Sequence, residues 1–123
     1  MKQNQIKEKS FAFAVRAFKL YKYLAENKKE HLLSKQFARS GTSIGANVSE
    51  ALRAQTKPDF IAKMSIALKE ANETEYWLRL LYATEYLTKS EFDSMYRDID
   101  ELISLLVAIC KTSQQNQKQN AKT

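Results

Sequence analysis

Few residues in this 123-residue chain are of the types that carry acid–base or metal chemistry. His31 is the only histidine and Cys110 the only cysteine, so neither a histidine pair nor a cysteine set is available to bind zinc. One histidine and one cysteine also give little material for a nucleophile with an adjacent base. We predict a solvated turn position for His31 and an inert buried thiol at Cys110. We therefore expect no enzymatic activity, small-molecule substrate, metal or cofactor.

Two further patterns resemble cofactor sites but lack their decisive parts. Glu70, Glu73 and Glu75 form an acidic cluster, yet the Glu-x-x-His pairs of di-iron helical bundles are missing. Gly41 and Gly45 lie close together, but no Gly-Lys-Ser/Thr sequence follows them and no strand is expected before them. A phosphate-cradling loop is therefore not indicated.

Basic residues along the first predicted helix, residues 6–28, are the best candidates for binding nucleic acid. Lys9, Arg16 and Lys19 lie on one side of this helix, and Lys2 continues that side just before it. Their cations suit phosphate groups. A row of charges is equally typical of a solvated helix face, so the sequence leaves both interpretations open.

The most unusual stretch of the chain runs from residue 39 to residue 51, where Gly, Ser, Thr and Asn alternate with small apolar residues. Propensity alone favours a loop here. The spacing of Phe37, Gly41, Ile44, Val48 and Leu52 nevertheless follows a helical period and predicts a helix over residues 35–54. The two small glycines would then let another helix approach closely.

The same helix has a second, polar stripe formed by Arg39, Ser43, Asn47 and Glu50. One interpretation is contact with phosphate or with a protein partner. The other is that these groups pair with one another and with acidic residues of the next helix, such as Glu73, and so fix the helix register.

Helix starts are marked by capping residues. Ser34 is a candidate N-cap for the second helix. Thr56, with Pro58 and Asp59, predicts the start of a third helix that runs to about residue 86. A fourth helix, capped by Thr88 with Glu91 three residues later, is expected to continue to about residue 111.

Aromatic residues exceed what the core of a small bundle requires. The candidates for exposure are Phe11, Phe18, Tyr76, Trp77 and Tyr82. Aromatic side chains at helical spacing favour a subunit interface, and the alternative is stacking on nucleic-acid bases.

These elements together predict an all-α fold, an antiparallel up-and-down four-helix bundle over residues 1–111. The polar segment 112–123 is expected to be a disordered tail. The sequence predicts neither a signal peptide nor a membrane span, and its single cysteine fits a reducing cytoplasm.

Charge is unevenly spread along the chain. Residues 1–57 carry a net charge of +8, residues 58–110 carry −5, and the last thirteen residues carry +3. The basic and acidic halves could attract each other within the bundle, drive subunits together, or leave a basic face for nucleic acid.

The run from Phe37 to Ala51, followed by residues 66–78, resembles the bacterial four-helix-bundle family encoded in intervening sequences of 23S ribosomal RNA genes, also labelled S23 ribosomal proteins. The resemblance covers about residues 6–111, and the pattern Arg-Ser-Gly-x-Ser-Ile-x-x-Asn-x-x-Glu from Arg39 to Glu50 carries it. It implies a bundle that assembles into a ring, with a pentamer favoured. Similar rings are the accessory proteins of diversity-generating retroelements, which bind a reverse transcriptase and nucleic acid.

We therefore expect a non-enzymatic, ring-forming protein whose basic surface binds RNA or DNA, beside a partner protein such as a reverse transcriptase. The alternative is a purely structural or protein-binding oligomer with no nucleic-acid role.

Overall fold

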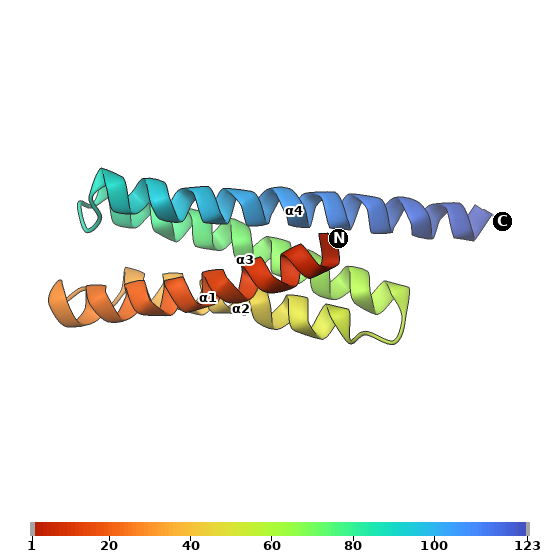
Figure 1. Ribbon diagram of the computed structural model, residues 1–123, viewed down its shortest axis with the longest axis horizontal. Helices are drawn as coiled ribbons and strands as arrows, with labels where there is room; N and C mark the ends of the chain where they lie inside the picture. Colours follow the sequence, from red (N-terminus) through yellow and green to blue (C-terminus); the bar gives the residue numbers. More distant parts are fainter. Residues whose placement is uncertain (1, 123) are drawn as a thin grey trace.

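The protein is a bundle of four long helices. The computed structural model describes the backbone of residues 2–122 and the side chains of residues 3–118. The helices are α1 (Lys2–Asn27), α2 (Leu33–Leu52), α3 (Lys57–Ala83) and α4 (Lys89–Lys122) (Figure 1). No strand occurs within residues 2–122, so the predicted all-α fold is confirmed.

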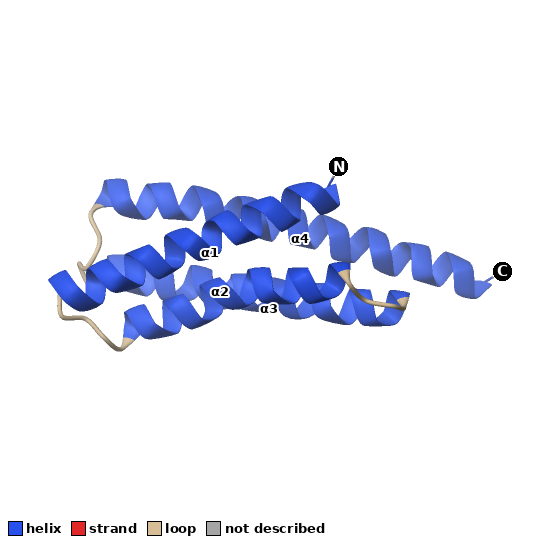
Figure 2. Ribbon diagram, turned by 60° about the horizontal axis from the view of Figure 1, so that its bottom comes forward, coloured by secondary structure: helices blue, strands red, loops and turns tan. Residues whose placement is uncertain are grey.

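Consecutive helices run in opposite directions and pack side by side, because their connections are short. Each helix packs against the next, and α4 closes the bundle by meeting α1 (Figure 2). The contact between α1 and α4 is the smallest of the four. Along the described residues α1 and α3 do not pack against each other, so they lie at diagonal positions.

The core is built from the apolar stripe of each helix. Fully buried side chains come from all four, including Phe13, Phe37, Leu78 and Leu106. Phe13 and Phe37 meet edge to face, with ring centroids 6.3 Å apart. Each such side chain contributes roughly 1.5–3 kcal/mol by leaving water, which makes this shared core the main force that holds the helices together.

The glycine- and serine-containing stretch is a continuous helix, as its spacing predicts. Its hydroxyl groups do not compete with the helix, because they donate to carbonyl groups one turn earlier. Thr42 donates to the Ala38 carbonyl at 2.8 Å and Ser43 to the Arg39 carbonyl at 2.6 Å.

The predicted close approach at the two glycines is also found. A Cβ placed on Gly41 would lie 2.9 Å from the Cβ of Ala17, and one on Gly45 would lie 3.3 Å from the carbonyl oxygen of Ser10. Both neighbours belong to α1, so α1 packs closely against α2 at the two glycine positions.

Two of the three predicted helix starts are confirmed. The amide of Asp59 donates to the Thr56 hydroxyl at 3.2 Å. At α4 the bonds are reciprocal: the amide of Glu91 donates to the Thr88 hydroxyl at 3.2 Å, and the amide of Thr88 donates to the Glu91 carboxylate at 2.8 Å. The pair at Thr88 and Glu91 is a complete capping box, whereas Thr56 is an N-cap with only the first of the two bonds.

The prediction that Ser34 caps α2 is wrong. The helix begins at Leu33, and the carboxylate of Glu30 accepts hydrogen bonds from the amides of Leu32, Leu33 and Ser34 at 3.0, 2.9 and 2.6 Å. A carboxylate reaches these free amides and also stabilises the positive end of the helix dipole. Ser34 is buried in the first turn instead, where its hydroxyl donates to the Glu30 carbonyl.

The third helix ends three residues earlier than predicted, at Ala83. Glu85 adopts a left-handed backbone conformation with φ of 71°. The amide of Tyr86 donates to the Leu81 carbonyl at 3.0 Å, and that of Glu85 to the Tyr82 carbonyl, also at 3.0 Å. This is a Schellman ending, here without the glycine that usually marks it.

The disordered tail predicted for residues 112–123 is not confirmed. The fourth helix does not stop at residue 111 but continues to Lys122 (Figure 1), and Thr123 lies outside the described residues. Gln and Lys, which make up half of the segment, are good helix formers, and adding residues to an existing helix avoids the cost of nucleation.

Candidate functional site

Two of the four candidate nucleic-acid-binding cations lie in the seam between α1 and α4. The Lys9 ammonium contacts the Glu101 carboxylate at 2.7 Å. The Arg16 guanidinium donates to the Asp98 carboxylate and, at 2.8 Å, to the Ser94 hydroxyl. These contacts tie the basic helix to the acidic one, so a phosphate group would have to compete with two carboxylates for Lys9 and Arg16.

The other two candidates are placed differently. Lys19 is exposed and lines a hollow between α1 and α4 together with Arg16. Lys2 begins α1, but its side chain lies outside the described residues. The structure therefore brings Arg16 and Lys19 to the same hollow. It also pairs Lys9 and Arg16 with carboxylates of α4.

The polar stripe of α2 pairs mainly with α3. The Arg39 guanidinium contacts the Glu73 carboxylate at 3.0 Å and the Glu70 carboxylate at 3.6 Å. Farther along the helix, Glu50 contacts the Lys63 ammonium at 3.1 Å. These three contacts match the interpretation that the stripe fixes the register of two helices.

The middle of the stripe bonds to its own helix. The Ser43 hydroxyl donates to the Arg39 carbonyl, and the Asn47 amide donates to the Ser43 carbonyl at 2.8 Å. Neither side chain is fully exposed. Within the described residues, the stripe therefore offers outside ligands fewer free polar groups than its sequence indicates.

A buried polar contact beneath the stripe was missed by the sequence reasoning. The hydroxyl of Thr74 donates to that of Ser40 at 2.9 Å, between α2 and α3. The signal was available, because Ser40 follows the core residue Phe37 by three positions and so lies on the buried side of a helix.

The candidate interface aromatics do not form one patch. Phe11 and Phe18 remain 71% and 52% exposed on α1, and Tyr76 remains 58% exposed on α3. Trp77 instead packs against the core and is only partly exposed. Tyr82 stacks on Phe92 of α4, with ring centroids 4.4 Å apart.

The two residues with nucleophile or base chemistry lie apart in the chain. His31 is exposed in the α1–α2 connection. Burial raises the pKa of the Cys110 thiol, partly opposed by a hydrogen bond with the Ser65 hydroxyl, and a raised pKa disfavours the reactive thiolate. No group of three or more metal-ligating side chains is found in the part of the chain that the structure describes. No helix of that part is both long and apolar enough to cross a membrane.

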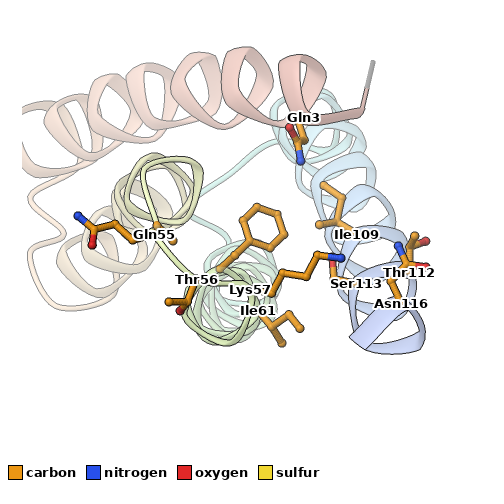
Figure 3. Close-up of a pocket in the computed structure, with 11 residues that line it drawn as sticks. Gln3, Gln55, Thr56, Lys57, Ile61, Ile109, Thr112, Ser113 and Asn116 are labelled. Carbon is orange, nitrogen blue, oxygen red and sulfur yellow. The ribbon is translucent and has the colours of Figure 1, made fainter. Parts of the chain in front are cut away.

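A pocket of about 550 Å³ lies at the end of the bundle where α2 turns into α3. Apolar side chains line it from two helices: Phe60 and Ile61 from α3, and Ile109 from α4. Figure 3 shows Lys57 extending across the pocket toward Ser113 of α4. In the same view Gln3 points into the space from α1, whereas Gln55 points away from it.

The family model of the 23S rRNA-intervening sequence proteins matches residues 2–108. The chain belongs to this family. A solved structure that it resembles is a protein of unknown function from the S23 ribosomal protein family of Bacteroides thetaiotaomicron, with 56% sequence identity and a TM-score of 0.89. The similarity covers 90% of this chain and 99% of that one. Among proteins with curated functions, none matches the sequence.

The matched range of the 23S rRNA-intervening sequence protein family includes most of this chain but not the last part of α4. The core, the Arg39 stripe and the α1–α4 seam all lie within the matched residues. The pocket lies only partly within them, because Ile109, Thr112, Ser113 and Asn116 form its α4 wall beyond residue 108.

Proposed function

We propose that this chain is a non-enzymatic assembly module that forms a ring with copies of itself and binds nucleic acid through its basic surface. The observation that carries the proposal is the exposure of Phe11 and Phe18 on α1 together with that of Tyr76 on α3. Large exposed aromatic side chains that gather on a helix face are typical of protein interfaces.

The position of these aromatics favours a ring over a two-fold dimer. A head-to-tail interface joins two different surfaces of neighbouring copies, and it closes into a ring when the rotation permits. Here the exposed aromatics lie on α1 and α3, which occupy diagonal positions and so face different sides of the bundle. The aromatic face of α1 would pack on the Tyr76 face of α3 in the next copy.

The assembly is tested by measuring the native mass of the wild-type chain and of the double variant Phe11→Ser, Phe18→Ser by light scattering. A pentamer corresponds to five copies of the 14.2 kDa chain. We expect the variant to be monomeric and still folded, because both side chains are largely exposed.

Val107→Ser is the matched control, since Val107 is an exposed apolar residue of α4, 46% accessible. Its mass should equal that of the wild type. A monomeric wild-type chain at micromolar concentration would overturn the ring, and a double variant with unchanged mass would overturn the role of α1.

Nucleic-acid binding is the second part of the proposal, and the charge distribution supports it. The chain has a net charge of +6, although Lys9, Arg16, Arg39 and Lys63 are compensated by carboxylates. The excess positive charge thus lies on other residues. Binding of RNA or DNA that weakens as salt rises would support this part, and no binding at low salt would contradict it.

A further inference from the structure

One end of the bundle, formed by three separate segments of the chain, carries a net positive charge. The start of α1, the α2–α3 connection and the last part of α4 lie toward the same end (Figure 1). Among the residues whose side chains are described, the corresponding segments 3–8, 49–63 and 107–118 contain six Lys or Arg and three Asp or Glu, a net charge of +3. One of the three carboxylates, Glu50, is paired with Lys63. This net positive charge attracts a polyanion to this end of the bundle.

The pocket between α3 and α4 opens at this basic end. Its volume of about 550 Å³ falls within the range of about 300–1,000 Å³ that is typical of small-molecule sites. The residues that line it include no carboxylate, and Lys57 is their one charged group. An anionic ligand would thus meet attraction without local repulsion.

The lining combines three kinds of contact. Phe60 supplies an aromatic ring, flanked by the aliphatic Ile61 and Ile109. Lys57 supplies a cation, and Gln3 an amide that both donates and accepts hydrogen bonds. A flat heterocycle with polar edges and an attached phosphate would satisfy all three.

We propose that this pocket receives one unpaired nucleotide of a single-stranded nucleic acid, with its base against Phe60 and its phosphate at Lys57. The inference rests on the nucleic-acid binding proposed above and assigns it a site. Single strands are recognised by stacking of unpaired bases on aromatic side chains, with cations along the backbone. The surrounding cations, among them the exposed Lys7, Arg53 and Lys111, would then contact neighbouring phosphates.

The chemistry favours a single strand over the two other polyanions that a basic end attracts. The bases of a duplex are stacked on one another, so they do not present a free face to Phe60. An acidic peptide brings carboxylates for Lys57 but no flat ring for an aromatic and aliphatic pocket. Duplex and acidic peptide therefore serve as competing ligands in the test.

The test is fluorescence anisotropy with labelled single-stranded RNA and DNA of about 12 nucleotides, at several salt concentrations. Phe60→Leu keeps an apolar side chain but removes the ring, and we expect it to weaken binding about tenfold. Phe60→Tyr keeps the ring and should bind like the wild type. Lys57→Gln should make the fall of log affinity with log salt less steep. The magnitude of the slope should decrease by about 0.7, as for one lost phosphate contact.

Lys69→Gln is the matched control, because Lys69 is an exposed lysine of α3 that does not line this pocket. It should leave affinity and slope nearly unchanged. Thermal unfolding of each variant checks that the bundle is intact, and the binding of Phe60→Tyr separates loss of the ring from loss of the fold.

The outcomes distinguish the site from the function on which it rests. If the wild type binds no single strand at low salt, the nucleic-acid function and this site are both overturned. If it binds but Phe60→Leu and Lys57→Gln behave like Lys69→Gln, only the site is overturned. Equal binding of the duplex, or displacement by polyglutamate as effective as that by RNA, would also overturn it.

Discussion

The hydroxyl of Thr74 donates a hydrogen bond of 2.9 Å to the hydroxyl of Ser40, and both residues are completely buried between α2 and α3. Ser40 in turn donates to the Gln36 carbonyl at 3.1 Å. One position earlier in each helix, Arg39 and Glu73 form an ion pair on the surface. A buried contact and a surface contact thus fix the same register of α2 against α3, as the architectural interpretation of the Arg39 stripe predicts.

Replacing Thr74 by Val should destabilise the bundle by about 1 kcal/mol, because the side chain keeps its size but loses its donor. In a double-mutant cycle with Ser40→Ala, the losses of unfolding free energy of the two single variants should not add, and the coupling energy should be about 0.5 kcal/mol or more. Urea unfolding of the single and double variants measures these free energies. Thr42→Val is the control, since the Thr42 hydroxyl donates to carbonyls of its own helix, and strictly additive costs for Thr74 and Ser40 would contradict the contact.

Gly41→Ala should cost about 1–3 kcal/mol, although alanine is the better helix former. The new Cβ would lie 2.9 Å from the Cβ of Ala17, and a methyl group fixed to a helix backbone cannot turn away. The double variant Gly41→Ala, Ala17→Gly should recover part of the loss, measured by thermal or urea unfolding. A stabilising effect of Gly41→Ala alone would show that α1 does not approach α2 this closely.

Helix positions and most helix starts could be predicted from the sequence because their causes are local. The N-cap at Thr56 and the capping box at Thr88 depend on residues within four positions of each other. The helical period through Gly41 and Gly45 outweighed their low propensity, since packing against α1 compensates for it. The family resemblance rested on the same local motif, and residues 2–108 match the family.

The sequence could not predict contacts between residues that are far apart in the chain and meet only in the folded bundle. Lys9 and Arg16 look like a free basic stripe on one helix, and their partners Glu101 and Asp98 are more than eighty positions away. The Glu30 cap was missed because serine is the more common N-cap residue, and a carboxylate four residues before Ser34 is an unusual substitute. The pocket arises only because α4 continues beyond residue 111 beside the α2–α3 connection.

Glu30→Gln should destabilise the protein by about 1 kcal/mol at pH 7, the usual cost of a lost helix cap. Burial raises the pKa of Glu30, but the hydrogen bonds from the amides of Leu33, Ser34 and Leu32 outweigh it and hold the pKa below the ordinary 4.5. A folded-state pKa below the unfolded one means that the charged cap stabilises the protein above about pH 4.5. This contribution is lost as the pH falls through the lower, folded-state pKa.

The difference in stability between wild type and Glu30→Gln should therefore shrink toward zero as the pH is lowered below that range. Thermal unfolding across the acid range measures it. Glu26→Gln is the control, because Glu26 is an exposed carboxylate near the end of α1. A difference that stays constant from neutral to acid pH would contradict the role of the charged carboxylate.

Asp98→Asn should weaken the seam between α1 and α4, where the Asp98 carboxylate accepts from Arg16. Both side chains are 41% exposed, so water screens the pair and the loss should be no more than about 1 kcal/mol. The loss should decrease in 1 M salt, because screening then acts over about 3 Å. Asp100→Asn removes the same charge from an exposed position of α4 and should leave stability nearly unchanged. If both variants lose equal stability with equal salt dependence, the effect belongs to the net charge, and Arg16 is free for other partners.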